Sequence, residues 1–187
     1  MNINEFENMM KELYVKKADY FKSTWNRVLP FGDMLTDRWG KAKLLNFGDK
    51  TSIYDNSLVF GDVTVGENTW IGPFTILDGS AGKLTIGTYC CISSGVQIYT
   101  HDSIAHYVTG GKAGFKKKST SIGDCTYLGP FSVVTRGVNI GKHCIIGAFS
   151  LVNKDIPDYS VAWGQPASVM GNIEIDENGN VNINYYK

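Results

Sequence analysis

The sequence has no excess of charge of either sign and no long apolar run. Its 187 residues include 18 Lys plus Arg against 18 Asp plus Glu, so no overall field draws the chain to nucleic acid or to an anionic membrane. No apolar stretch approaches the roughly 20 residues of a membrane span, and the N-terminus lacks the pattern of a signal peptide. We therefore expect one globular unit in the cytoplasm, with no nucleic-acid partner and no membrane span.

Cysteine and histidine are also scarce, with four and three copies. The cysteines lack the Cys-x-x-Cys spacing of zinc or redox sites. Cys90 and Cys144 occupy a position that small residues fill throughout the chain, where cysteine acts as a compact apolar filler. We expect a structural role for all four cysteines.

What the sequence has instead is a six-residue repeat. A small or β-branched residue stands four places after most of the aliphatic positions, and glycine often follows the aliphatic residue directly. Such a short period indicates a solenoid, in which each turn returns the same residue type to the same interior edge. The aliphatic positions are Ile53, Val59, Val65, Ile71 and Leu77, then Ile86, Ile92 and Ile98, then Ile122, Leu128, Val134, Ile140, Ile146 and Val152.

The repeat is interrupted twice. Between Leu77 and Ile86 the step is nine residues, which predicts a three-residue bulge in the 78–82 stretch. Between Ile98 and Ile122 the repeat positions 110 and 116 hold Gly and Lys instead of aliphatic residues, so residues 99–121 are expected to form an external loop. A long loop that the scaffold does not require is commonly functional.

Both ends of the chain lack the repeat. Residues 1–50 are expected to form a helical and irregular cap over the open end of the solenoid, with Asn4 and Glu7 spaced as a capping box. Residues 51–170 carry the solenoid. In residues 171–187, alternating apolar residues flank an Asn-Gly pair, which predicts a C-terminal hairpin.

The period of six, with its small residue four places on, resembles the hexapeptide-repeat family. The resemblance covers residues 53–170 and implies an all-β solenoid, a left-handed parallel β-helix of triangular cross-section with three hexads in each turn. Left-handed winding runs against the usual right-handed crossover of parallel strands, so this expectation rests on the resemblance alone.

A narrower resemblance is to the acetyltransferases of this family that act on sugars and similar small acceptors, including galactoside, maltose, xenobiotic and O-antigen or nucleotide-sugar acetyltransferases. The segments that carry it are 95–102, 122–129, 146–157 and 164–167. The resemblance implies acetyl-CoA as cosubstrate, no metal, and a homotrimer whose active sites lie between adjacent β-helices. It also implies a hydroxyl or amino group of a sugar or nucleotide-linked sugar as acceptor, in the synthesis of cell-surface polysaccharide such as lipopolysaccharide.

His101 matches the catalytic histidine of these enzymes and is the predicted general base. Acyl transfer from a thioester needs a base that takes the proton of the acceptor, and histidine can take and return a proton near neutral pH. Asp102, its neighbour, either orients the imidazole, binds acceptor hydroxyls or only forms a turn.

Six positions match coenzyme contacts of the family, and two of them depart from its pattern. Pro130 has no N–H to donate, and Ser168 stands where Arg or Lys is usual, which removes a phosphate contact. Either Lys154 or the loop lysines 116–118 would supply the missing positive charge, unless the loop lysines are only solvated. The six positions are Tyr127, Pro130, Ala148, Asn153, Lys154 and Ser168.

Two other functions fit a hexapeptide helix. Carbonic anhydrases of the γ type bind zinc through three histidines, and this chain has His101, His106 and His143. In that family, however, the third ligand precedes the close pair, whereas His143 follows it. The other alternative is a catalytically silent scaffold, because fold alone does not dictate function.

Overall fold

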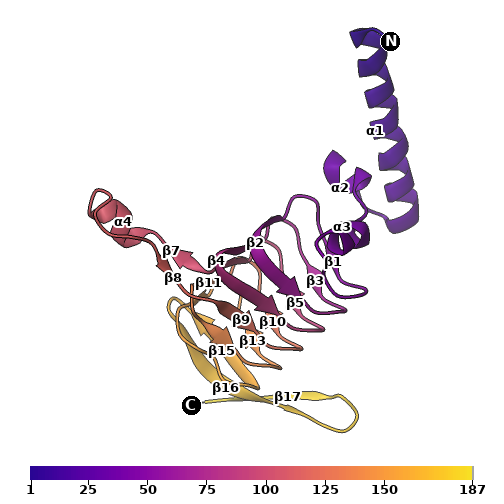
Figure 1. Ribbon diagram of the computed structural model, residues 1–187. Coiled ribbons are helices and arrows are strands. Elements are labelled where there is room, and N and C mark those ends of the chain that lie inside the picture. The colour runs from indigo at the N-terminus through magenta and orange to yellow at the C-terminus, as the bar shows by residue number, and fades with distance from the viewer. Residues whose placement is uncertain (187) are drawn as a thin grey trace.

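A computed structural model describes residues 1–186. The chain winds into a parallel β-helix, from which helices at the N-terminal end, one loop and a C-terminal hairpin extend (Figure 1). The short strands stack in parallel from coil to coil, as expected when each hexad supplies one strand and one corner.

Three rows of strands form the walls of the helix. The first row consists of β1 (Ser52–Ile53), β3 (Trp70–Ile71), β5 (Cys91–Ile92), β10 (Tyr127–Leu128), β13 (Ile145–Ile146) and β15 (Ser160–Gly164). The second row consists of the first parts of β2 (Leu58–Val65) and β4 (Ile76–Ile86), followed by β6 (Gln97–Tyr99), β11 (Val133–Val134) and β14 (Leu151–Val152). The third row consists of the last parts of β2 and β4, followed by β9 (Thr120–Ile122) and β12 (Asn139–Ile140).

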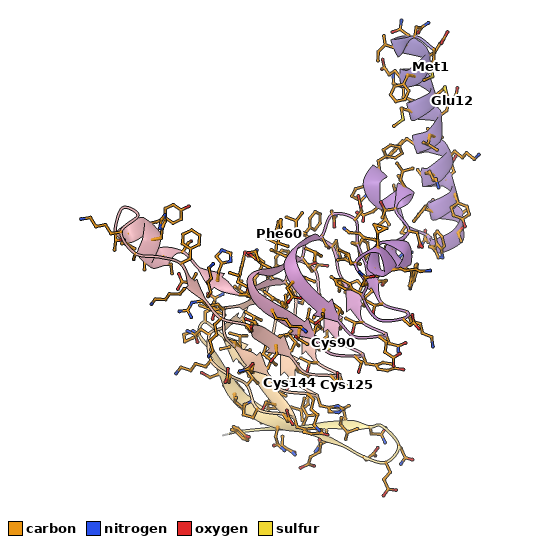
Figure 2. The ribbon with its side chains drawn as sticks, in the orientation of Figure 1. Met1, Glu12, Phe60, Cys90, Cys125 and Cys144 are labelled. Atoms are coloured by element: carbon orange, nitrogen blue, oxygen red, sulfur yellow. The ribbon has the colours of Figure 1, made fainter. Side chains whose placement is uncertain are left out.

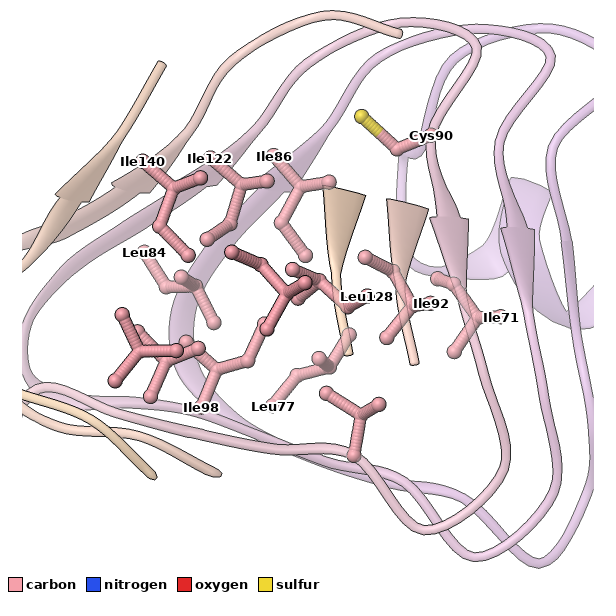
Figure 3. Close-up of a cluster of buried hydrophobic side chains, with 14 of the residues drawn as sticks. Ile71, Leu77, Leu84, Ile86, Cys90, Ile92, Ile98, Ile122, Leu128 and Ile140 are labelled. Atoms are coloured by element: carbon pink, nitrogen blue, oxygen red, sulfur yellow. The ribbon is translucent and has the colours of Figure 1, made fainter. Parts of the chain in front are cut away.

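The aliphatic repeat positions form the core, as the sequence predicts. Their side chains stack in the interior of the coils (Figure 3), and apolar surface removed from water in this way stabilises the fold by about 25 cal/mol per Å². Val59 differs, because it is only half-buried on β2 in the first coil, at the end of the second row of strands.

The strand register locates both interruptions of the repeat. Ile53 pairs with Ile71, so an uninterrupted coil takes 18 residues. Opposite Gly61 to Val63 of β2, β4 advances from Gly79 to Leu84, which is three residues more, so the predicted bulge is confirmed. Ile92 pairs with Leu128, so the next coil contains 18 extra residues.

Those extra residues form the external loop. Its base is a short antiparallel pair, β7 (His101–Asp102) with β8 (Lys116–Lys117), and its outer part contains α4 (Ile104–Val108). Figure 1 shows this loop standing away from the coils.

The N-terminal part contains α1 (Ile3–Trp25), α2 (Phe31–Leu35) and α3 (Arg38–Leu44). The capping box of α1 uses Asn2 and Glu5, so the prediction of Asn4 and Glu7 was wrong by two residues. It is α3 that lies against β1 and places Ala42 in the core. By contrast, α1 buries no residue, and its side chains stand clear of the coils (Figure 2).

The last coil continues into antiparallel strands. β15 pairs with β16 (Ala167–Ile175), and β16 pairs with β17 (Val181–Tyr185) around a turn at residues 176–180. None of the helices in the described part of the chain is long and apolar enough to cross a membrane.

The cysteines differ in burial, and this predicts their reactivity. Cys90 and Cys144 are buried and Cys125 is exposed (Figure 2). Burial raises the pKa of the Cys90 thiol to about 11 and also raises the pKa of Cys91 and Cys144, and the thiolate is the reactive form. We expect N-ethylmaleimide to modify Cys125 first in the folded protein, and the other three mainly after unfolding. Peptide mass spectrometry over time checks this order, and labelling of Cys90 as fast as Cys125 would contradict it.

Candidate active site

His101 lies where the external loop leaves the coil. The residue before it, Thr100, is buried, and its hydroxyl donates a hydrogen bond to the carbonyl of Asp78 at 2.9 Å. Lys118, at the other end of the loop, is anchored too, because its backbone N–H donates a hydrogen bond to the carbonyl of Thr100 at 3.0 Å. The base of the loop is therefore anchored to the scaffold on both sides of His101.

A buried carboxylate stands beside the His101 ring. Nδ1 of His101 lies 3.2 Å from Oδ2 of Asp78, whose side chain is only 9% exposed. The alignment is that of a charge contact rather than of a well-directed hydrogen bond, since Nδ1 has no hydrogen-bond partner within residues 1–186. Such contacts are often loose before substrate binds. The other oxygen of Asp78 accepts a hydrogen bond from the N–H of Ser80 at 2.9 Å, which fixes the carboxylate.

Asp78 is a site residue that was not predicted from the sequence. The available signal was the break in the repeat, because the nine-residue step begins at Asp78. Once the bulge is counted, Asp78 falls opposite Tyr99 in the register, two residues from His101. The coil thus brings together two groups that are 23 residues apart in sequence.

A cavity of about 680 Å³ opens beside His101, within the range of small-molecule sites. Four of the predicted site residues meet there, namely His101, Asp102, Asn153 and Lys154. The other lining residues are Tyr99, Ser103, Ile104, Lys118, Thr135, Arg136, Gly137, Val138 and Asp155.

Asp102 lines the cavity but does not face the imidazole in the way that Asp78 does. Its Oδ1 accepts a hydrogen bond from the N–H of Ile104 at 2.7 Å, and its Oδ2 lies 3.5 Å from Nε of Arg136. Of the roles considered for Asp102, the turn is therefore present, and the carboxylate beside His101 belongs to Asp78.

Tyr99 contributes a phenol to the cavity wall. Burial, together with the negative charge of Asp78, raises the pKa of Tyr99, so the phenol keeps its proton at neutral pH. The hydroxyl donates a hydrogen bond to Oε1 of Gln97 at 2.8 Å, and the ring stands edge-on to that of His101.

The remaining predicted coenzyme residues do not line this cavity. Tyr127 lies on β10, Pro130 and Ala148 lie in turns after β10 and β13, and Ser168 lies on β16. Pro130 accepts a hydrogen bond from the N–H of Phe149 through its carbonyl. Among the loop lysines, Lys118 reaches the cavity, whereas Lys116 and Lys117 are exposed on β8.

The three histidines do not converge. The His106 ring packs against Phe115 in the loop, and the His143 ring stacks on Tyr159 at a corner of the coils. Within residues 1–186, no group of three or more His, Cys, Asp or Glu side chains is placed to hold a metal ion.

Known proteins share this sequence pattern and this fold. Residues 119–154 match the bacterial transferase hexapeptide (six repeats) family. The probable acetyltransferase Rv3034c of Mycobacterium tuberculosis is 33% identical over 138 residues, which cover 72% of this chain and 44% of the relative. The galactoside O-acetyltransferase of Escherichia coli is 30% identical over 131 residues, which cover 59% of this chain and 64% of that enzyme. The chain thus spans less than two thirds of the length of either relative.

Among solved structures, the hexapeptide-repeat acetyltransferase VCA0836 of Vibrio cholerae, complexed with acetyl-CoA, superposes with a TM-score of 0.65 at 22% identity. The match covers 86% of this chain and 87% of that one.

The coils define a parallel β-helical protein, and a cavity lined by His101 opens where a loop leaves the scaffold. The chain carries the repeat of the bacterial hexapeptide transferases over residues 119–154 and is similar to acetyltransferases over a longer stretch. The fold shared with its structural neighbours implies that the helix is left-handed.

Proposed function

We propose that this protein transfers an acetyl group from acetyl-CoA to a hydroxyl or amino group of a sugar, with His101 as general base. The observation that carries the proposal is the His101–Asp78 pair at a cavity of small-molecule size. The names of the relatives, which include an acetyltransferase acting on galactosides, support the same class of reaction.

The chemistry assigns one task to each member of the pair. Nε2 of His101 accepts the proton of the acceptor as its oxygen or nitrogen attacks the acetyl carbonyl carbon. The C–S bond of the thioester then breaks, and His101 returns the proton to the departing thiolate, so that free coenzyme A leaves. Asp78 holds the ring through Nδ1 and stabilises the imidazolium between the two transfers, as the carboxylate of a catalytic triad does.

We assign the coenzyme to the surface between the cavity and the last coils. Asn153 and Lys154 line the cavity, and Lys154 has no ion-pair partner within residues 1–186. Its positive charge can therefore serve a phosphate and replace the one that Ser168 lacks. Tyr127, Pro130, Ala148 and Ser168 lie outside the cavity of the same chain.

The separation of these four coenzyme residues from the cavity of the same chain favours a trimer, in which the last coils of one chain face the cavity of its neighbour. Because the proposed cosubstrate is acetyl-CoA, we expect the protein to act in the cytoplasm. We expect its product to be used in the synthesis of cell-surface polysaccharide. Light scattering on the purified protein tests the trimer, and a mass of one chain would contradict it.

The release of free thiol from acetyl-CoA tests the proposed reaction. We expect at least one member of a panel of sugars and amino sugars to raise the rate clearly above the acceptor-free background. Mass spectrometry of the product then separates O- from N-acetylation. If no sugar raised the rate, the protein would be a scaffold or would act on another class of acceptor, and stoichiometric zinc would favour the carbonic anhydrase alternative.

A further inference from the structure

The cavity beside His101 contains more positive charge than the proposed reaction uses. Three cations line it, Lys118, Arg136 and Lys154, together with two carboxylates, Asp102 and Asp155. Arg136 was not predicted from the sequence, and Lys118 was predicted only as one of three loop lysines.

Both carboxylates are already engaged. Asp155 is bound to the third row of strands, because its Oδ1 accepts a hydrogen bond from the N–H of Asn139 at 2.8 Å. Asp102 accepts from the N–H of Ile104 and lies 3.5 Å from Nε of Arg136. Asp102 therefore balances Arg136 in part, while no carboxylate within residues 1–186 lies at ion-pair distance from Lys118 or Lys154.

Lys118 is exposed, but its stem lies against the coil beside Arg136. Gly137 has a positive φ of 77°, and its N–H donates a hydrogen bond to the buried hydroxyl of Thr120 at 3.0 Å. A Cβ at this position would collide with the side chain of Lys118, so glycine lets the aliphatic stem of the lysine lie against the coil. Arg136 directly precedes this glycine, is 27% exposed, and has a buried Nε that makes no well-aligned hydrogen bond within residues 1–186.

We propose that Arg136 and Lys118 bind an anionic group of the acceptor, so that the enzyme prefers a sugar that carries a phosphate or a carboxylate. This inference rests on the proposed transfer reaction and on the assignment of Lys154 to the coenzyme. A guanidinium presents a fork of donors that matches a carboxylate or phosphate, and a lysine beside it adds a point charge. Arg136 and Lys118 are specificity-determining residues that position the acceptor near His101, whereas His101 takes the proton.

Matched pairs of acceptors test the proposal. We expect glucosamine 6-phosphate to exceed glucosamine, or glucuronate or UDP-glucose to exceed glucose, by at least roughly tenfold in kcat/KM, because hydrogen bonds to charged groups are the stronger ones. The preference is the ratio of kcat/KM for the charged sugar to kcat/KM for the neutral one. Arg136→Gln and Lys118→Gln are each expected to lower this ratio by roughly 10- to 100-fold. Any loss of kcat/KM with the neutral sugar should be smaller than the loss with its charged partner, and the KM for acetyl-CoA should not rise. Lys112→Gln, on the exposed outer part of the loop, is the matched control and should keep the preference.

Calorimetric titration of the same sugars into the protein separates the two proposals. Tighter binding of an anionic sugar, lost in Arg136→Gln, would support the anion site even if no sugar released thiol, in which case only the transfer reaction would fail. Equal binding of the charged and neutral members of every pair would overturn the anion site. A rise in the KM for acetyl-CoA in both variants would also overturn it, because the cations would then hold the phosphates of the coenzyme.

Discussion

His101→Ala is expected to lower kcat by roughly 10²- to 10⁴-fold, the usual contribution of a positioned general base. That loss corresponds to about 3–5 kcal/mol of transition-state stabilisation. The acceptor would have to lose its proton to water, and the buried Asp78 would have no imidazolium to stabilise. Binding of acetyl-CoA should persist, because the residues assigned to the coenzyme lie on other coils. Thiol-release kinetics measure the loss in kcat, and calorimetry measures the binding.

His106→Ala is the matched control for this variant. His106 belongs to the same loop, and its ring also packs against Phe115, but it does not line the cavity. We expect His106→Ala to retain most of the turnover. If His101→Ala remained fully active, His101 would not be the base. If both variants lost activity equally, the loss would come from a changed loop conformation and not from a missing base.

The scaffold could be predicted from the sequence because one physical requirement recurs in every coil. Ile98, Leu128 and Ile146 are all fully buried, as a repeating interior demands, so a period of six was sufficient to place them. The bulge and the loop could be predicted as well, because they are the two places where this period is interrupted. The start of α1 could not be fixed in this way, since Asn2 with Glu5 and Asn4 with Glu7 both have capping-box spacing.

The site was predictable only in part, because its contacts join different coils. His101 was visible through the resemblance of its surrounding segment. Asp78 and Arg136 were not, since each reaches the site through strand register and belongs to a segment that resembles ordinary turns. Asp102 shows that being adjacent in sequence does not establish a contact either. It adjoins His101 in sequence, yet its carboxylate contacts Arg136 and the backbone of Ile104.

Asp78→Asn is expected to keep the fold and to lower kcat by roughly 10- to 10³-fold, less than the about 10⁴ seen when the carboxylate of a catalytic triad becomes an amide. The amide is of the same size, and its oxygen can still accept the hydrogen bond from Ser80 that Oδ1 receives. What is lost is the negative charge 3.2 Å from Nδ1 of His101. Without it the imidazolium is less stable, because an opposite charge at this distance favours the charged form.

This loss of charge predicts a result that a merely structural role would not produce. In Asp78→Asn the loss should fall on kcat and leave the KM values for acetyl-CoA and the acceptor near those of the unaltered protein, because the proposed role of Asp78 is exerted through His101. Asp102→Asn is the matched comparison: it removes a carboxylate of the same cavity that contacts Arg136 instead, so it should keep kcat and chiefly lower the KM for an anionic acceptor, because Asp102 then no longer balances the charge of Arg136 in part. If Asp102→Asn lowered kcat and Asp78→Asn did not, the orienting role would belong to Asp102.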